Sequence, residues 1–261
     1  MQPTTSLNLP LSTATIIIPA YNEEKRIGKV LGEIADFISK NDLNWNIIVS
    51  IDGNDGTENI VKNLSTRYDI ISYNKSSTRG GKGFAIKRAV KDATGEFTIL
   101  MDADGSIDFK EIVSSFVNLS NFDVILFDRY SNRDNKIPLI RRIPSRGFNL
   151  LIRVLLRIKV NDTQCGYKII RTDMLKEAFK KVTVTNTFYD VDLLYHLYKM
   201  NARIKEVEIE YRHDDQSKFN VFSEVIGQGV SLIAFRLRHS RFYKFVPDWA
   251  RILYYKKFRW I

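Results

Sequence analysis

Residues 98–108 read TILMDADGSID, and this stretch decides how the first half of the chain is interpreted. Apolar and β-branched residues predict a buried strand that runs directly into Asp102 and Asp104. A turn at the end of a strand accounts for one aspartate. Two carboxylates one residue apart repel each other, and a hard divalent cation between them would remove that repulsion. By itself the pair is also compatible with an ordinary turn.

The sequence around this stretch alternates between strand and helix patterns. Runs that predict strands occupy residues 13–20, 45–52, 69–74 and 96–102, and helical apolar spacing occurs in residues 23–40, 57–67 and 81–93. Alternation of this kind predicts a parallel sheet with helices on its faces. Ligands bind such sheets at the carboxyl ends of the strands. The polar segments that fall there are PAYNEE, IDGNDGT, TRGGKG and DADGS.

The regular alternation ends after residue 109. Helices are expected at 111–119, 173–179 and 190–200, and strands at 123–130, within 162–171 and at 203–212. Residues 216–261 contain nine basic and eleven aromatic residues. We therefore expect an N-terminal tail at 1–12, an α/β domain at 13–215, and a basic, aromatic, amphipathic extension at 216–261 that lies on a membrane surface.

Composition limits the classes of partner and location. Of 261 residues, 40 are Lys or Arg and 30 are Asp or Glu, and the net charge of +10 predicts an anionic partner. The single Cys165 excludes an internal disulfide framework and is expected to be a small buried residue. The N-terminus lacks the pattern of a signal peptide, and no run approaches the roughly 20 apolar residues of a membrane span. We expect a protein that lies on a membrane without crossing it.

Two motifs near the aspartates suit a nucleotide, and both have a structural alternative. Glycines around Lys82 precede a helix, where backbone N–H groups favour an anion, although the spacing is not that of a P-loop. A helix start without a ligand fits this motif equally well. The segment PAYNEEKRI offers an aromatic ring for a base and carboxylates for a ribose. Its alternative is a helix cap, with Asn22 as N-cap and acids in the first turn.

Residues 129–159 hold nine Lys or Arg against one acid. Apolar residues are interleaved with them, which favours an amphipathic surface that meets anionic headgroups or a lipid phosphate over a simply solvated face. No recognised nucleic-acid-binding module is present, so nucleic acid is not expected as a partner. The three histidines are scattered, and no zinc site or nucleophile triad is evident.

The ordered set IIIPAYNEE, IDGNDGT, GKGFAIKRA and MDADGS resembles family 2 glycosyltransferases of the GT-A fold. The later segments DRY, RRIPSRGFNLLIR, VNDTQCGYKIIR, YDVDLL and EYRHDDQSKF are similar to the dolichyl-phosphate glucose and mannose synthases. The resemblance covers residues 13–220 and implies a Rossmann-like, mainly parallel mixed sheet flanked by helices. It implies an inverting transfer of a hexose to dolichyl or polyprenyl phosphate for glycan assembly, with UDP-glucose favoured as donor and GDP-mannose as the other candidate. The protein would lie peripherally on the cytoplasmic face of a membrane.

The resemblance also implies roles for individual residues. Asp102 and Asp104 would hold Mg²⁺ or Mn²⁺ on the donor diphosphate, and both count among the catalytic residues. The residues that would bring the donor and lipid phosphates together are Arg129, Arg141 and Ser145. The residues that would bind the nucleotide-sugar are Pro19, Ala20, Tyr21, Glu23, Asp52, Lys82, Ala103, Arg212 and Lys218.

Two positions depart from the family pattern. Ile51 stands where an aspartate is common, and Ser106 stands where the mannose type often carries glutamine. Two other functions stay open. One is a family 2 transferase that acts on a saccharide or protein hydroxyl and would need a base such as Asp190 or Asp192. The other is a non-catalytic protein that binds a membrane surface.

Overall fold

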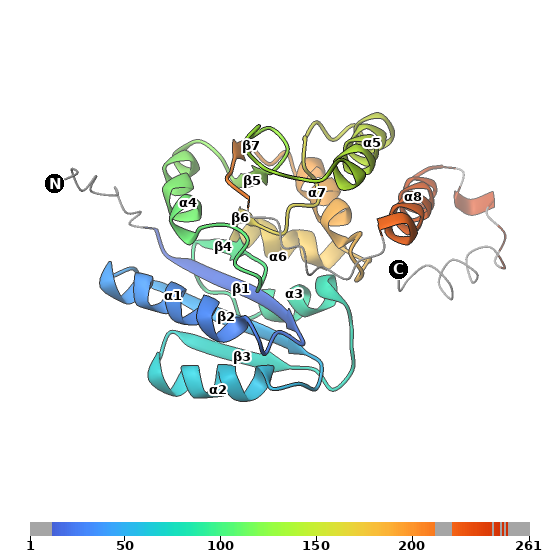
Figure 1. The fold of residues 1–261 in the computed structure, drawn as a ribbon. Coiled ribbons are helices and arrows are strands. Elements are labelled where there is room, and N and C mark those ends of the chain that lie inside the picture. Colours follow the sequence, from blue (N-terminus) through green and yellow to red (C-terminus); the bar gives the residue numbers. More distant parts are fainter. Residues whose placement is uncertain (1–11, 212–220, 242, 246, 248, 250–261) are drawn as a thin grey trace.

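The computed structural model describes residues 12–211 and 221–249, with 242, 246 and 248 excepted. Within this part of the chain, strands form one sheet in the order β3-β2-β1-β4-β6-β5-β7 (Figure 1). β6 is antiparallel to both β4 and β5, and the other neighbours are parallel. The strands are β1 (Ala14–Tyr21), β2 (Trp45–Asp52), β3 (Ile71–Lys75), β4 (Phe97–Leu100), β5 (Val124–Asp128), β6 (Lys168–Arg171) and β7 (Ile204–Glu208). This mixed, mainly parallel sheet confirms the predicted fold class.

Helices cover both faces of the sheet. One face packs against α1 (Ile27–Lys40), α2 (Thr57–Arg67) and α4 (Phe109–Ser114), which continues into the 3-10 helix η1 (Ser115–Ser120). The other face packs against α3 (Lys82–Val90), α6 (Thr172–Lys181) and α7 (Tyr189–Lys199), with α5 (Leu139–Leu156) and α8 (Val221–Arg238) outside them. A short 3-10 helix, η2 (Tyr243–Phe245), follows α8.

The apolar run of β1 explains why both faces are covered. Ile16 and Ile18 enter the core under α1, and Ile17 enters the core under α3. A strand buried on both sides carries a continuous apolar run, because each side chain loses contact with water whichever face it points to. Each such side chain contributes about 1.5–3 kcal/mol through burial. The single apolar stripe of α1, from Ile27 to Ile38, matches a helix that lies on only one face.

The start of α1 corrects one sequence interpretation. The helix begins at Ile27, and Asn22 has a left-handed backbone (φ 55°), so Asn22 is not its N-cap. The Asn22 side chain instead accepts a hydrogen bond from the backbone N–H of Asn54 (3.3 Å). The Glu24 carboxylate accepts one from the N–H of Gly56 (2.8 Å). These polar side chains tie the loop after β1 to the loop after β2.

The predicted domain boundary at residue 216 lies outside the described residues. The described part of the extension includes α8, which buries Leu232 and Phe235 in the core under α3, α6 and α7. The ring of Phe235 also contacts that of Phe188, with centroids 5.6 Å apart. This part of the extension therefore packs on the domain.

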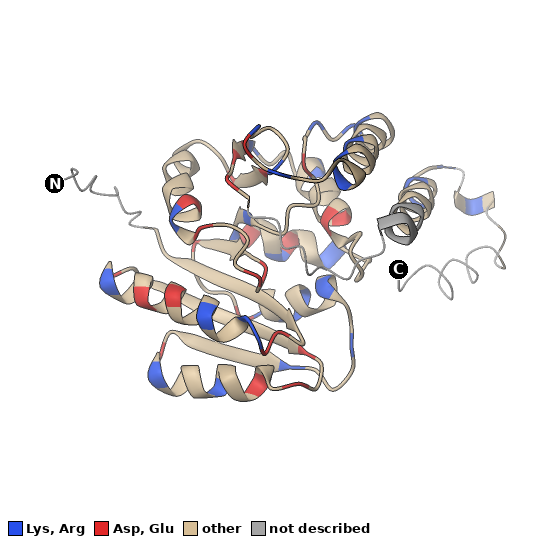
Figure 2. Ribbon diagram, in the orientation of Figure 1, with Lys and Arg blue, Asp and Glu red and all other residues tan. Residues whose placement is uncertain are grey.

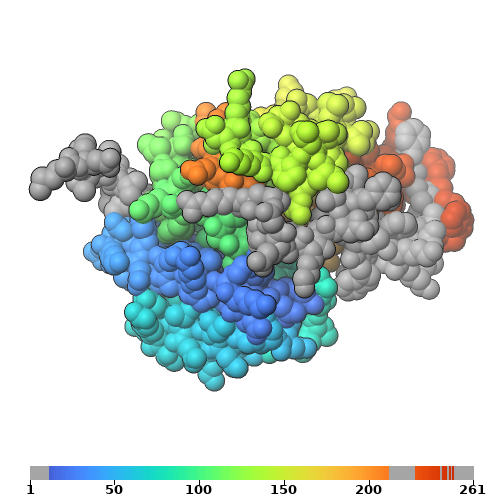
Figure 3. All heavy atoms as spheres, viewed as in Figure 1, coloured from blue at the N-terminus to red at the C-terminus, as the bar shows by residue number. Residues whose placement is uncertain are grey.

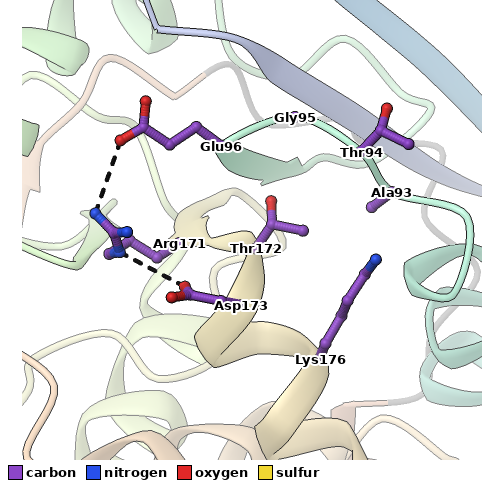
Figure 4. Close-up of a pocket in the computed structure, with 8 residues that line it drawn as sticks. All are labelled: Ala93, Thr94, Gly95, Glu96, Arg171, Thr172, Asp173 and Lys176. Carbon is purple, nitrogen blue, oxygen red and sulfur yellow. Dashed lines mark ion pairs between the residues drawn. The ribbon is translucent and has the colours of Figure 1, made fainter.

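A surface hollow lies at the amino end of β4, opposite to the end that carries Asp102 and Asp104. Figure 4 shows the residues that line this hollow. Its lining residues are 93–96, 171–173 and 176. Arg171 there pairs with Glu96 (3.7 Å) and Asp173 (3.5 Å). Because this hollow lies at the amino end of β4, it belongs to a different region from the polar loops predicted to bind a ligand.

Candidate active site

Asp102 and Asp104 lie in the turn that follows β4. The N–H of Met101 still bonds to Ile17 of β1 (3.1 Å), after which the chain leaves the sheet. Asp104 accepts a hydrogen bond from the N–H of Ser106 (3.0 Å), and Gly105 provides the positive φ of 65° that this turn requires. Both aspartates therefore sit at the carboxyl end of a central strand, as predicted.

Lys82 forms an ion pair with Asp102. Burial alone would lower the pKa of Lys82, but the carboxylates of Asp102 and Asp190 outweigh burial and raise it. Burial alone would raise the pKa of Asp102, but the Lys82 ammonium outweighs it and holds the pKa below its ordinary value. Both groups are therefore charged, and each stabilises the charge of the other.

The glycines before α3 fix the position of Lys82. Gly81 has φ +87°, and a Cβ there would lie 2.7 Å from the carbonyl oxygen of Thr185. A Cβ on Gly83 would lie 2.5 Å from Cβ of Tyr189. The N–H of Gly83 also donates to Thr185 (3.0 Å). These glycines let α3 pack closely against the segment that leads into α7, and that packing holds Lys82 beside Asp102.

Antiparallel β6 brings a second group of residues to the aspartates. A Cβ on Gly166 would lie 2.0 Å from Oδ2 of Asp102, so the chain passes directly against that carboxylate. The hydroxyl of Tyr167 donates to Asp104 (3.0 Å). Burial, with the charges of Asp104 and Asp102, raises the pKa of Tyr167 well above its ordinary value, so the phenol stays protonated as a donor. Sequence reasoning missed these residues as site residues, although they lie in the quoted segment VNDTQCGYKIIR.

Several residues that are predicted to bind the nucleotide-sugar lie at the carboxyl ends of β1 and β2. Pro19, Ala20 and Tyr21 pair with Ser50, Ile51 and Asp52. Tyr21 is exposed at the carboxyl end of β1, and the Arg79 guanidinium lies 4.2 Å from the centroid of its ring.

Asp52 is buried and already has partners in the protein. It accepts hydrogen bonds from Arg88 (3.0 Å) and from the N–H of Gly80 (3.0 Å). The Asp52 carboxylate therefore holds the loop that contains Gly80 and Gly81, just before α3. Ile51, which replaces the common aspartate, lies in the hydrophobic core under α1.

Glu23 lies on the same side as the two aspartates. Burial, together with the negative charges of Asp104 and Asp102, raises its pKa, although the bonds from Arg26 (2.9 and 3.0 Å) oppose the shift. Ala103, between the aspartates, is buried. The structure thus brings Glu23, Asp102 and Asp104 into one acidic region at the strand ends.

The carboxylate oxygens of Asp102 and Asp104 are suitable ligands for Mg²⁺ or Mn²⁺. Carboxylate oxygens are the ligands that these hard cations prefer. Among the described residues, no group of three or more His, Cys, Asp or Glu side chains is arranged to hold a metal. Asp102 and Asp104 would therefore hold a cation together with oxygens from a bound ligand.

Residues 15–179 match the sequence profile described as Glycosyl transferase family 2. The chain belongs to this family. It is therefore a glycosyltransferase, as the sequence motifs predicted.

The chain is also similar to dolichyl-phosphate beta-glucosyltransferases. The chain is 28% identical over 244 residues to a dolichyl-phosphate beta-glucosyltransferase of Dictyostelium discoideum, covering 86% of this chain and 74% of that protein. It is 25% identical over 248 residues to the Mus musculus protein of the same name, covering 88% and 76%.

Solved structures support the GT-A fold. Glucosyl-3-phosphoglycerate synthase from Mycobacterium tuberculosis with UDP superposes with a TM-score of 0.64 at 17% identity, covering 87% of this chain and 79% of that one. The same enzyme with Mn²⁺, UDP-glucose and glycerol 3-phosphate gives a TM-score of 0.60 at 16% identity, covering 85% and 80%.

In this glycosyltransferase, Arg129 follows β5 and is held by a buried carboxylate. Its Nε and Nη2 donate to Asp162 at 2.7 and 3.0 Å. The guanidinium also lies 5.5 Å from the Tyr130 ring centroid and 5.4 Å from that of Tyr211. Burial would lower the pKa of Arg129, but Asp162 outweighs it and raises the pKa well above the ordinary value. Arg129 was predicted from the sequence but Asp162 was not, and the role of Arg129 at a phosphate stays a prediction.

The other predicted phosphate-binding residues lie on α5 or outside the described residues. Arg141 is in the first turn of α5, and Ser145 follows one turn later on the same helix. Ser145 lies near Tyr130, the residue that follows Arg129 in the chain. Arg212 and Lys218 lie outside the described residues.

Both carboxylates considered as a base are occupied. Asp190 is buried and accepts a hydrogen bond from the fully buried Lys168 (2.5 Å), which also donates to the carbonyl of Cys165. Asp192 is fully buried and accepts from the N–H groups of residues 183 (2.8 Å) and 184 (3.0 Å). These contacts are typical of structural carboxylates, since each already has donors within the protein.

No helix in the described part of this glycosyltransferase has the length and apolar character needed to cross a membrane.

Proposed function

We propose that this glycosyltransferase moves a glucosyl residue from a nucleotide-sugar, UDP-glucose in the first instance, to dolichyl or polyprenyl phosphate for glycan assembly. GDP-mannose remains the second donor to test. The names of the relatives support the acceptor class and the sugar. The observation that carries the proposal is that Asp190 and Asp192 are both buried, with Lys168 bonded to Asp190 and backbone N–H groups bonded to Oδ2 of Asp192, contacts that disfavour a role as the base.

The donor would bind across the ends of β1, β2 and β4. Tyr21 would contact the base, and Glu23 would contact a ribose hydroxyl. Asp102 and Asp104 would hold Mg²⁺ or Mn²⁺ against the diphosphate, and the cation would stabilise the negative charge of the leaving nucleotide. Lys82, in contact with Asp102, would bring a further positive charge to the diphosphate. Tyr167 would keep Asp104 oriented through its hydrogen bond.

The acceptor phosphate is itself an anionic nucleophile, so no strong base is required. The chemistry requires positive charge that brings two anions together and holds them in line. Arg129 and Arg141 would supply that charge, with Ser145 as a hydroxyl donor. Guanidinium groups suit a phosphate monoester because they offer paired N–H donors. Direct displacement of the nucleotide would invert the anomeric centre of the sugar.

The acceptor is a lipid, and α5 offers a surface that suits a lipid headgroup region. Basic residues recur along α5, which lies at the surface of the molecule (Figures 2 and 3). The exposed large apolar residues on this helix are Leu139, Ile140, Ile143, Leu150, Leu151 and Val154. An exposed apolar face interleaved with arginines suits a peripheral position on an anionic membrane surface. We propose the cytoplasmic face, where nucleotide-sugars are available.

A donor and acceptor panel tests the proposal. The full chain is incubated with UDP-glucose or GDP-mannose, a polyprenyl phosphate or a saccharide, and Mn²⁺, and the lipid and water phases are analysed for transferred sugar. We expect glucosyl-phosphoryl-polyprenol that depends on Mn²⁺. Transfer to the saccharide but not to the lipid phosphate would refute the proposed acceptor.

Vesicle flotation tests the membrane proposal separately. We expect binding to anionic vesicles at low salt and weaker binding at physiological salt, where charges are screened over about 8 Å. Equal binding to neutral and anionic vesicles would contradict the proposed role of the α5 arginines.

A further inference from the structure

Lys82 contacts the same carboxylate that the proposed function assigns to the metal. It is the first residue of α3, and its ammonium pairs with Asp102. A divalent cation that binds Asp102 must therefore compete with a positive charge that is already there.

The surrounding charges leave Lys82 dependent on Asp102. The nearby Asp190 also raises the pKa of Lys82, but Asp190 is already paired with the buried Lys168. Asp104 contributes as well, although it is engaged by Tyr167 and by the N–H of Ser106. If the Asp102 carboxylate binds a metal ion, the ammonium of Lys82 therefore loses its direct partner.

The backbone of Lys82 is fixed, so the displaced ammonium stays in the site. Gly81 and Gly83 pack against the segment 185–189 with no room for a Cβ, and the N–H of Gly83 is bonded to Thr185. The side chain can rotate, but its Cα does not move away from the strand ends. A metal ion alone would thus leave an ammonium close to a divalent cation, which is repulsive.

We propose that Lys82 is a resident counter-cation for Asp102, and that it couples the binding of the metal to the binding of the nucleotide diphosphate. The diphosphate gives the displaced ammonium a new anionic partner and shares the metal with Asp102. The metal and the nucleotide then bind cooperatively, whereas the metal alone binds weakly. This inference rests on the proposed metal and nucleotide site, and it assigns Lys82 a role in the order of assembly.

The test measures binding, without turnover. Mn²⁺ bound to the full chain is determined by electron paramagnetic resonance with and without UDP, and UDP binding is determined by calorimetry with and without Mn²⁺. Because coupling is reciprocal, both pairs of measurements must yield the same factor, and typical coupling factors are about 5- to 150-fold. We expect a factor in this range for the wild-type protein.

Variants separate the charge of Lys82 from other effects. In Lys82→Met, Mn²⁺ alone should bind at least about fivefold more tightly than in the wild type, and the coupling factor should fall correspondingly. Lys82→Gln should behave in the same way and covers the case in which the methionine variant does not fold. Lys82→Arg, which keeps the charge, should retain the coupling. Lys91→Met removes a lysine from the exposed end of the same helix and should match the wild type.

Two results would overturn the inference, and they can be told apart. If Lys82→Met and Lys82→Gln bind Mn²⁺ alone no more tightly than the wild type, Lys82 is not the competing cation. The proposed function then still stands, provided that Mn²⁺ binds with UDP. If the wild type binds no Mn²⁺ even with saturating UDP, the proposed metal site fails together with the inference.

Discussion

Replacing Gly166 by alanine should displace the Asp102 carboxylate while leaving the fold in place. The new Cβ would lie 2.0 Å from Oδ2 and 2.5 Å from Cγ of Asp102. Carbon and oxygen atoms that are not bonded prefer separations of about 3.5 Å, so the carboxylate must move by more than about 1 Å. It is the end of a side chain, so it can rotate without moving β4. The rotation would take it away from Lys82 and from the position where it would hold a cation.

We expect a large loss of activity in a variant that stays folded. A displacement of about 1 Å in a catalytic group costs about 10²-fold in rate, which corresponds to about 2.7 kcal/mol of transition-state stabilisation. Overpacking costs about 1–3 kcal/mol of folding free energy. Each kcal/mol lowers Tm by about 2–4 °C in a chain of this size, so the variant should remain folded at assay temperature.

The assay compares kcat/KM for sugar transfer with Tm for two glycine variants. Gly147→Ala is the matched control, because a Cβ there meets nothing within 4 Å and Gly147 lies inside α5. Alanine in a helix interior stabilises by about 0.5–1 kcal/mol relative to glycine, so this control should keep its activity with an equal or higher Tm. A folded Gly166→Ala variant with unchanged kcat/KM would show that the position of the Asp102 carboxylate does not matter for transfer.

Other substitutions test the remaining parts of the site. Asp102→Asn should reduce turnover by orders of magnitude with little change in Tm, because the metal that balances the charge of the diphosphate loses a ligand. EDTA should reproduce this loss, and full activity in EDTA would contradict the metal assignment. Arg141→Ala should cost about 2–5 kcal/mol in transfer to polyprenyl phosphate, with a smaller effect on donor hydrolysis by water; equal losses in both reactions would argue against a role at the acceptor. Asp162→Ala should lower the free energy of unfolding by about 3–5 kcal/mol, because the partly buried guanidinium of Arg129 loses its bidentate partner, and denaturant titration measures this. Burial raises the pKa of Cys165 to about 12, so iodoacetamide at mildly alkaline pH should alkylate it only after unfolding; rapid alkylation of the folded protein would contradict its buried position.

Local sequence patterns were sufficient to predict most of the fold. The continuous apolar runs of β1, β2 and β4 and the 3.6-residue spacing of α1 each arise within one segment, so each can be recognised without its neighbours. The position of Asp102 and Asp104 also followed, because the carboxyl ends of parallel strands meet at one edge of the sheet. The start of α1 was misplaced, because Asn22 takes a left-handed backbone and bonds to the loop after β2.

The partners of the site residues depended on tertiary structure. β6 runs antiparallel between β4 and β5, and this pairing places Gly166 and Tyr167 against aspartates that lie more than sixty positions earlier in the chain. From the sequence alone, a charged residue such as Lys168 is expected to be exposed to solvent, and Asp190 was considered as a possible base. In the structure the two residues pair with each other inside the protein. The sequence determined which residues reach the strand ends, since strand order and alternation are local. Only the fold decided which of those charges are already neutralised, because an ion pair depends on distances between segments that the sequence does not specify.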